Sequence, residues 1–225
     1  MPYYLADDFS GLFPPAHHAL AEPDGLLAVG GNLKPETLLQ AYSQGIFPWY
    51  SDDQPVLWWS PNPRCVLFPH KLKISRSLKK TLNKKIYEIR VDTAFAEVMQ
   101  ACAAPRKDEA GTWINNDMLS AYCWLHELGY AHSIECWNNN KLVGGLYGLR
   151  IGDMFFGESM FSRQTDASKV ALEYLCHTLK PELIDVQVHS DHMESLGAEV
   201  IKRDAFIDRV NHYCGKALNP VIQSA

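Results

Sequence analysis

Three polar side chains in two apolar segments are the first candidates for chemistry. Glu158 lies in segment 153–162, which is otherwise rich in Phe and Met, and Asp185 and Gln187 alternate with aliphatic residues in segment 183–189. On a β-strand, Asp185 and Gln187 would share one face. An unpaired carboxylate is costly to bury, so we expect Glu158 to meet a cation or to bind an amine. The pattern predicts a site that holds an apolar group beside a polar reaction centre.

Each of these residues also has a purely structural interpretation. Glu158 could accept a hydrogen bond from a nearby turn, and the polar face that carries Asp185 and Gln187 could simply be solvated. The pattern of segment 183–189 is that of a central strand, where polar side chains are less expected to be exposed to solvent without a role. We therefore favour a functional site.

A strand–helix–strand unit would position the three residues. Both segments read as strands, and the apolar spacing over 167–179 predicts a helix that Pro181 closes. That order favours two parallel strands joined by a right-handed crossover. Strands over 130–137 and 142–151, separated by an Asn-rich turn, predict a preceding hairpin.

From Arg64 onward the predicted order is helices, a hairpin, a third strand, a crossover helix and a parallel strand. This order resembles the GNAT fold, in which a splayed sheet holds an acyl donor. The first sixty residues are instead dense in Pro, Gly and Trp, with one helix predicted over 35–44. We therefore expect an α+β chain in which a small α/β cap, 1–62, packs on a GNAT-like domain, 63–225.

The connection 162–168 argues against coenzyme A as a cofactor. Backbone N–H groups of a glycine-rich loop and the following helix N-terminus hold pyrophosphate in acyl-CoA enzymes. Here the connection has no glycine and carries Asp166, whose charge repels phosphate. The histidines follow no strong zinc spacing. We expect neither a cofactor nor a metal.

Residues 71–85 form a basic run with no acidic residue among them. Leu78 and Leu82 are one helical turn apart, which predicts a helix with its cations facing water. In a chain of net charge -5, such a run is a candidate contact for a phosphate backbone. The alternative is a solvated helix face without a partner.

Composition sets further limits. With 225 residues, 47% of them hydrophobic, the chain can form one large domain or two small ones. Its six cysteines form no CxxC pair and no apolar leader is evident, which is typical of reduced thiols in the cytoplasm. No apolar run approaches the roughly 18–20 residues that cross a membrane. We expect a cytoplasmic monomer.

Several long motifs in one order make the chain resemble the leucyl/phenylalanyl-tRNA–protein transferases, bacterial enzymes that add Leu or Phe to N-terminal Lys or Arg of proteins. The motifs are FPPAHHALAEPDGLLAVGGNL at 13–33, AYSQGIFPWY at 41–50, WWSPNPRCVLFP at 58–69, TWI at 112–114, GESMFS at 157–162 and DVQVHSDHMESLGA at 185–198. The resemblance implies a GNAT-like domain that uses no coenzyme A and takes its donor from the 3′ end of aminoacyl-tRNA.

The resemblance also implies residue roles. Glu158 matches an acid that holds the donor α-amino group, and Asp185 and Gln187 match a pair at the reaction centre. The basic run matches a tRNA-binding region, with Arg76, Lys79, Lys80, Lys84 and Lys85 as candidates. Six residues match positions that line the pocket for the donor side chain: Trp49, Trp113, Phe155, Met160, Leu175 and Ile184. The family carries Phe near the position of Leu175.

The implied reaction is attack by an acceptor α-amino group on the aminoacyl ester of tRNA, which forms a peptide bond and marks the acceptor for degradation. The ester is already activated, so positioning and oxyanion stabilisation could supply much of the acceleration. Gln187 has no useful basicity, so we expect Asp185 to orient Gln187 and the proton to leave through water or the terminal adenosine hydroxyl. An apolar pocket distinguishes similar hydrophobes by only ~1–3 kcal/mol, which predicts weak acceptance of Met.

Two alternatives stay open at this point. One is a CoA-dependent N-acyltransferase, which the glycine-free connection disfavours. The other is a non-catalytic module that binds RNA or peptides.

Overall fold

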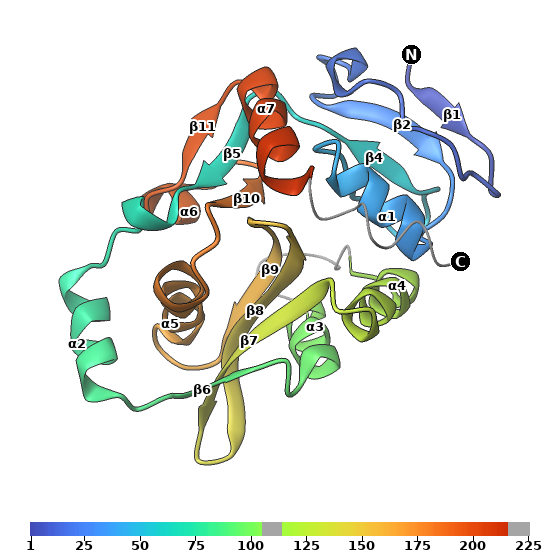
Figure 1. Ribbon diagram of the computed structural model, residues 1–225. Helices are drawn as coiled ribbons and strands as arrows, with labels where there is room; N and C mark the ends of the chain where they lie inside the picture. Colours follow the sequence, from blue (N-terminus) through green and yellow to red (C-terminus); the bar gives the residue numbers. More distant parts are fainter. Residues whose placement is uncertain (105–113, 216–225) are drawn as a thin grey trace.

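A computed structural model describes residues 1–104 and 114–215 of the chain as an α+β protein with two β-sheets (Figure 1). The smaller sheet has the strand order β1-β2-β4-β3 and the larger one the order β11-β5-β10-β9-β8-β7-β6. None of the described helices is long and apolar enough to cross a membrane.

The seven-stranded sheet contains one parallel pair, β9 with β10, while its other neighbours are antiparallel. This confirms the predicted parallel pair and the predicted hairpin, which is β7–β8. The strands are β5 Arg64–Leu67, β6 Glu88–Val91, β7 Ala131–Asn138, β8 Lys141–Ile151, β9 Met154–Ser162, β10 Leu183–Gln187 and β11 Glu199–Ile201.

The N-terminal region is more regular than its turn-rich composition suggests. Four short strands form its sheet: β1 Tyr3–Leu5, β2 Leu26–Gly30, β3 Phe47–Pro48 and β4 Leu57–Trp59. The predicted helix is α1, Pro35–Tyr42, with its proline in the first turn, where the missing N–H costs nothing. The chain changes sheet between Trp59 and Arg64.

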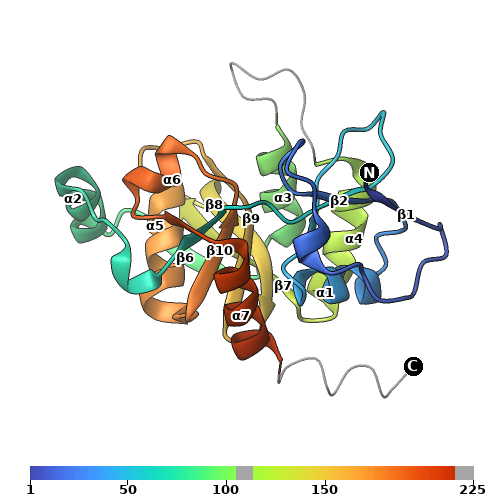
Figure 2. The same ribbon diagram turned by 90° about the horizontal axis from the view of Figure 1, so that it is seen from above.

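Helices cover both faces of the large sheet. They are α2 Arg76–Lys84, α3 Phe95–Ala103, α4 Asn116–Glu127, α5 Ala167–Tyr174, α6 Asp191–Ser195 and α7 Arg203–Cys214, with 3-10 turns at Ala16–His18 and Pro69–Lys71. Seen from above, α5 lies on one side of the sheet, and α3, α4 and the N-terminal region lie on the other (Figure 2).

The helices on the two faces of the sheet form two hydrophobic clusters with it. Successive side chains of β9 point to opposite faces, so β9 contributes to both clusters. Phe155 packs in the cluster under α5, and Phe156 packs in the cluster that joins the sheet to α1, α3 and α4. The second cluster crosses the change of sheet, since it contains Trp58 as well as Phe156. The division into domains 1–62 and 63–225 stays a prediction.

Two local irregularities distinguish the structure from the sequence pattern. The predicted helix over 167–179 is α-helical only to Tyr174, and Leu175–Leu179 form a π-helical turn. Such turns occur frequently at functional sites. The predicted strand 183–189 ends at Gln187, where the backbone has a φ of 67°. Both irregularities lie next to the cleft described below.

Candidate active site

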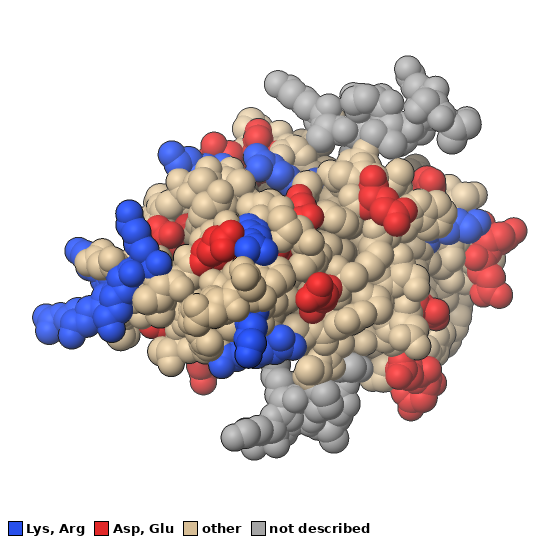
Figure 3. All heavy atoms as spheres, turned by 90° about the horizontal axis from the view of Figure 1, so that it is seen from below, with Lys and Arg blue, Asp and Glu red and all other residues tan. Residues whose placement is uncertain are grey.

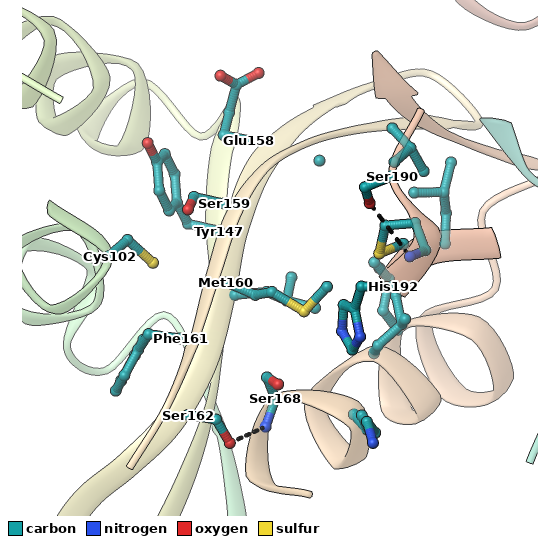
Figure 4. Close-up of a pocket in the computed structure, with 18 of the residues that line it drawn as sticks. Cys102, Tyr147, Glu158, Ser159, Met160, Phe161, Ser162, Ser168, Ser190 and His192 are labelled. Atoms are coloured by element: carbon teal, nitrogen blue, oxygen red, sulfur yellow. Dashed lines mark hydrogen bonds between the residues drawn. The ribbon is translucent and has the colours of Figure 1, made fainter. Parts of the chain in front are cut away.

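A cleft of about 1050 Å³ opens where β9 and β10 meet α5 and α6, and it extends past β9 toward the end of α3. Four of the predicted pocket residues line it: Phe155, Met160, Leu175 and Ile184. Figure 4 shows Met160 on the side of β9 that faces α5, and Tyr147 and Phe161 on the other side. The cleft therefore has an apolar wall of the kind that the sequence predicts.

One of the two predicted tryptophans, Trp49, lies away from the cleft. Trp49 follows β3, is 42% exposed and is not among the described residues that line the cleft. Its carbonyl accepts a hydrogen bond of 2.6 Å from Nε1 of Trp59. Trp113 lies outside the described residues.

A β-bulge at Glu158 places its side chain and that of Met160 on opposite faces of β9. Across the β8–β9 ladder, Tyr147 pairs with Ser159 and Gly148 pairs with Gly157, so Glu158 is an extra residue without a partner on β8. A bulge of this kind bends the strand and re-aims a side chain. Alternation from Phe156 directs Glu158 toward α1 and α4, and the bulge then reverses the alternation, so that Met160 lies on the opposite face, toward α5.

The carboxylate of Glu158 is surrounded by hydrogen-bond donors from three elements. The Tyr42 hydroxyl on α1 donates to Oε1 over 2.7 Å, and the Tyr122 hydroxyl on α4 donates to Oε2 over 3.3 Å. Nε2 of Gln187 donates to Oε1 over 2.9 Å. The two hydroxyls also contact each other. No described Lys, Arg or His forms an ion pair with this carboxylate, so the bound amine stays a prediction.

This environment changes the acidity of Glu158. Its removal from bulk water raises the pKa from 4.5 to about 7, and the negative charge of Asp185 adds to the rise. Hydrogen bonds from Tyr42, Gln187 and Tyr122 oppose it. Burial also raises the pKa of both tyrosine hydroxyls well above the ordinary value, so they remain donors near neutral pH. A cation that binds here would favour the ionised carboxylate.

Asp185 lies beneath the cleft, and its side chain is fully buried in an ion pair with Arg64. Nε of Arg64 donates to Oδ1 over 2.8 Å, and Nη2 donates to Oδ2 over 2.6 Å. Oδ1 also accepts the backbone N–H of Gln187 over 3.0 Å. The structure thus brings Asp185, Gln187 and Glu158 together, and Gln187 is the member that contacts both carboxylates.

Tyr147 has a polar group that no described residue satisfies. Its hydroxyl is fully buried and lacks a hydrogen-bond partner within residues 1–104 and 114–215. The side chain lines the cleft from the face of β9 opposite to α5 (Figure 4). Since buried hydroxyls are normally hydrogen-bonded, this group is available to a ligand or to water.

Part of the basic run, Arg76–Lys84, forms helix α2, which confirms the predicted helix. Ser75 caps its N-terminus by accepting the N–H of Leu78, and Leu78 is buried in the cluster under α5, the helix that α2 contacts. The five predicted tRNA-binding residues, Arg76, Lys79, Lys80, Lys84 and Lys85, are all exposed. Figure 3 shows Lys and Arg side chains gathered over the edge of the molecule that α2 forms.

Two features bear on cofactors. The carboxylate of Asp166 at the start of α5 accepts a hydrogen bond of 2.9 Å from Thr81, so a negative charge lies at this helix N-terminus, where a phosphate would otherwise be favoured. Among the described residues, the one group of potential metal ligands close enough to share an ion is His189, Asp191 and Glu194, all of them exposed.

Tyr42, Tyr122 and Arg64 are the site residues that sequence reasoning missed. The tyrosines lie in ordinary amphipathic helices, so nothing local marks them. Arg64 did carry a signal, since it is a charged residue that opens an apolar strand, the same kind of signal that singled out Glu158.

Comparisons with known proteins identify relatives over most of the chain. The family model described as leucyl/phenylalanyl-tRNA protein transferase matches residues 66–211, and the model of that family's N-terminal domain matches residues 31–62. A leucyl/phenylalanyl-tRNA–protein transferase from Nitrosospira multiformis is 58% identical over 213 residues, which cover 93% of this chain and 90% of the relative. The protein of that name from Nitrosomonas europaea is 59% identical over 202 residues, which cover 88% of this chain and 86% of the relative.

Solved structures match less closely. L-PGS from Bacillus licheniformis has a TM-score of 0.37 and 10% identity, with 73% of this chain and 53% of that chain covered. A GCN5-related N-acetyltransferase from Kribbella flavida has a TM-score of 0.34 and 11% identity, with 74% and 60% covered.

The raised pKa of Glu158 predicts a specific pH dependence of stability. The folded state holds a proton between pH 4.5 and about 7 that the unfolded state has lost, so the free energy of unfolding falls as pH rises through this window. Glu158→Gln, which mimics the protonated acid, should therefore gain about 2 kcal/mol relative to wild type between pH 5 and 8. The full shift would give about 3 kcal/mol, and partial solvation from the cleft reduces it.

Urea unfolding of both proteins at pH 5, 6, 7 and 8 measures this difference. The exposed Glu127→Gln variant is the control for loss of a carboxylate and should follow wild type at every pH. A constant difference between wild type and Glu158→Gln would contradict the assignment of the raised pKa to Glu158.

Proposed function

Because the chain belongs to the leucyl/phenylalanyl-tRNA protein transferase family, we propose that it transfers Leu or Phe, and Met weakly, from aminoacyl-tRNA to the N-terminal Lys or Arg of acceptor proteins. The product carries a new peptide bond and is marked for degradation. We further propose that the enzyme acts in the cytoplasm as a monomer. The observation that carries the proposal is the carboxylate of Glu158, which has only uncharged partners among the described residues and lies beside an apolar cleft.

The donor amino acid is held at two points. Its side chain enters the cleft between Phe155, Met160, Leu175 and Ile184, where apolar surface leaves water. Its α-ammonium group binds the carboxylate of Glu158, which the positive charge keeps ionised. Together these contacts select an apolar amino acid that still has a free α-amino group.

Gln187 completes the arrangement on the side of the reacting carbonyl. Its Nε2 donates to Glu158, and no described residue donates to its side-chain oxygen, which can therefore accept a hydrogen bond from the incoming amine. The amine attacks the ester carbonyl, a C–N bond forms, and the C–O bond to the terminal ribose breaks. The amine proton passes through water or the adenosine hydroxyl to the ribose oxygen.

A transfer assay tests this function. Wild-type protein is incubated with radiolabelled Phe-tRNA and a peptide that begins with Arg, without coenzyme A. We expect label in this peptide and none in a peptide of the same sequence that begins with Asp. Transfer that requires an acyl-CoA would indicate an N-acyltransferase, and binding without transfer would indicate a recognition module; either result contradicts the proposal.

The wall position Leu175 predicts how donor selection can be changed. Leu175 is 2% exposed and lines the cleft, so Leu175→Phe should reduce the space for the donor side chain. We expect kcat/KM for Phe-tRNA relative to Leu-tRNA to fall about 10-fold, within the range that pocket size can produce. Competition assays with both charged tRNAs measure the ratio. Leu179→Phe, on the same π turn but outside the cleft, is the matched control and should keep the wild-type ratio. An unchanged ratio for Leu175→Phe would remove Leu175 from the pocket.

The charge of α2 predicts the salt dependence of tRNA binding. Each lysine that neutralises a phosphate releases bound counterions, so Lys79→Ala with Lys80→Ala should lower the slope of log K against log[salt] by about two. Filter binding of tRNA between 50 and 200 mM salt measures this slope. Lys34→Ala with Lys141→Ala removes two exposed lysines outside α2 and should leave the slope unchanged. Equal slopes for the two double variants would exclude α2 as the tRNA contact.

A further inference from the structure

The backbone at Gln187 has a conformation that non-glycine residues rarely adopt. Its φ is 67°, and the N–H of Val188 donates to the carbonyl oxygen of Val186 over 2.9 Å. A hydrogen bond between residues i+2 and i across a central residue of positive φ defines a γ-turn, the rarer and more strained of its two forms. Strain of this kind persists only where the surrounding structure fixes it. The turn therefore needs an anchor.

Asp185 provides the direct anchor. Its Oδ1 accepts the N–H of Gln187 over 3.0 Å, at the point where the β5–β10 pairing shifts register. Because the ladder of hydrogen bonds is interrupted there, the N–H of Gln187 donates to the carboxylate of Asp185 in place of a strand partner. The orientation of the Gln187 amide thus depends on a fixed position for the Asp185 carboxylate.

Arg64 fixes that carboxylate from the neighbouring strand. The guanidinium donates to both oxygens of Asp185, over 2.8 and 2.6 Å, and its remaining nitrogen Nη1 donates to the carbonyl of Gly45 over 3.0 Å. It also lies over two aromatic rings, 4.7 Å from the centroid of Phe47 and 4.5 Å from that of Phe206. Both charged side chains are fully buried. All three nitrogens are engaged, so the pair has a single arrangement.

We propose that Arg64 is a positioning residue for aminoacyl transfer: by clamping Asp185 it holds Gln187 in the γ-turn that aims the Gln187 amide at Glu158 and the donor. This inference rests on the proposed function. Asp185 acts through Gln187 and exchanges no proton with the acceptor amine, because its oxygens are taken by Arg64 and by the Gln187 backbone. The ion pair of Arg64 and Asp185 therefore affects the rate of the transfer step. Binding of the donor depends instead on the cleft and on α2.

Arg64→Lys tests the clamp with the charge retained. A lysine ammonium is a point charge and cannot reproduce the two-pronged contact. We expect kcat for transfer from Phe-tRNA to fall about 100-fold, the scale of a misplaced reacting group, while KM for Phe-tRNA stays close to that of wild type. The control is Arg203→Lys, since Arg203 donates to the Ser60 carbonyl over 2.6 Å but has no contact with Gln187. We expect this control to keep the wild-type kcat.

A double variant separates positioning from folding. Arg64→Met with Asp185→Leu leaves no buried charge unpaired, so it should fold even where a single change, which leaves one buried charge without its partner, prevents folding. If the pair served stability alone, a double variant with the wild-type Tm would also have the wild-type kcat. We expect instead a folded protein with the low kcat of Arg64→Lys.

Wild-type kcat in Arg64→Lys, or in the folded double variant, would overturn the inference. A loss that appears only as a raised KM for Phe-tRNA would also overturn it. Failure of the wild-type protein to transfer label at all would instead contradict the proposed function, so the two failures are distinguishable.

Discussion

The site depends on the enclosure of one carboxylate whose described partners are all uncharged. Glu158 is held by two hydroxyls and an amide, and no described cation pairs with it. Its ionisation is therefore costly, which keeps its pKa near 7. A charged amine that arrives in the cleft would remove this cost. The same carboxylate can thus help to fold the protein in the protonated form and favour a cationic ligand in the ionised form.

The N-terminal region is part of this site as well as a cover for the sheet. It supplies Tyr42 to Glu158, and it supplies the Gly45 carbonyl and the Phe47 ring to Arg64. The larger sheet supplies the opposite partners, Glu158 from β9 and Asp185 from β10. The hydrogen bonds of Glu158 and Arg64 thus require both the N-terminal region and the larger sheet. The geometry of the site therefore depends on how these two parts pack against each other.

Much of the fold and part of the site could be predicted from the sequence, and the limits have physical causes. The strand patterns on either side of an Asn-rich turn predicted the hairpin, the strand–helix–strand order predicted the parallel pair, and a carboxylate in an apolar strand marked Glu158. The same periodicity could not reveal the bulge that turns Glu158 away from Met160, because a bulge breaks the period. The role of Tyr42 depends on a contact with a residue 116 positions away. The ion pair of Arg64 and Asp185 spans 121 positions, and no local pattern encodes it.

The most direct measurement of the central claim is the pKa of Glu158 itself, followed by NMR of a ¹³C-labelled carboxyl group with Glu158→Gln as the assignment control. Titration of the free protein should give a value near 7. Addition of an amide-linked phenylalanyl-adenosine, which cannot transfer its amino acid, should lower that value clearly, whereas its N-acetyl derivative, which lacks the ammonium charge, should not. A free-protein pKa close to the ordinary 4.5 of a glutamate, or a raised value that the charged ligand leaves unchanged, would contradict the account.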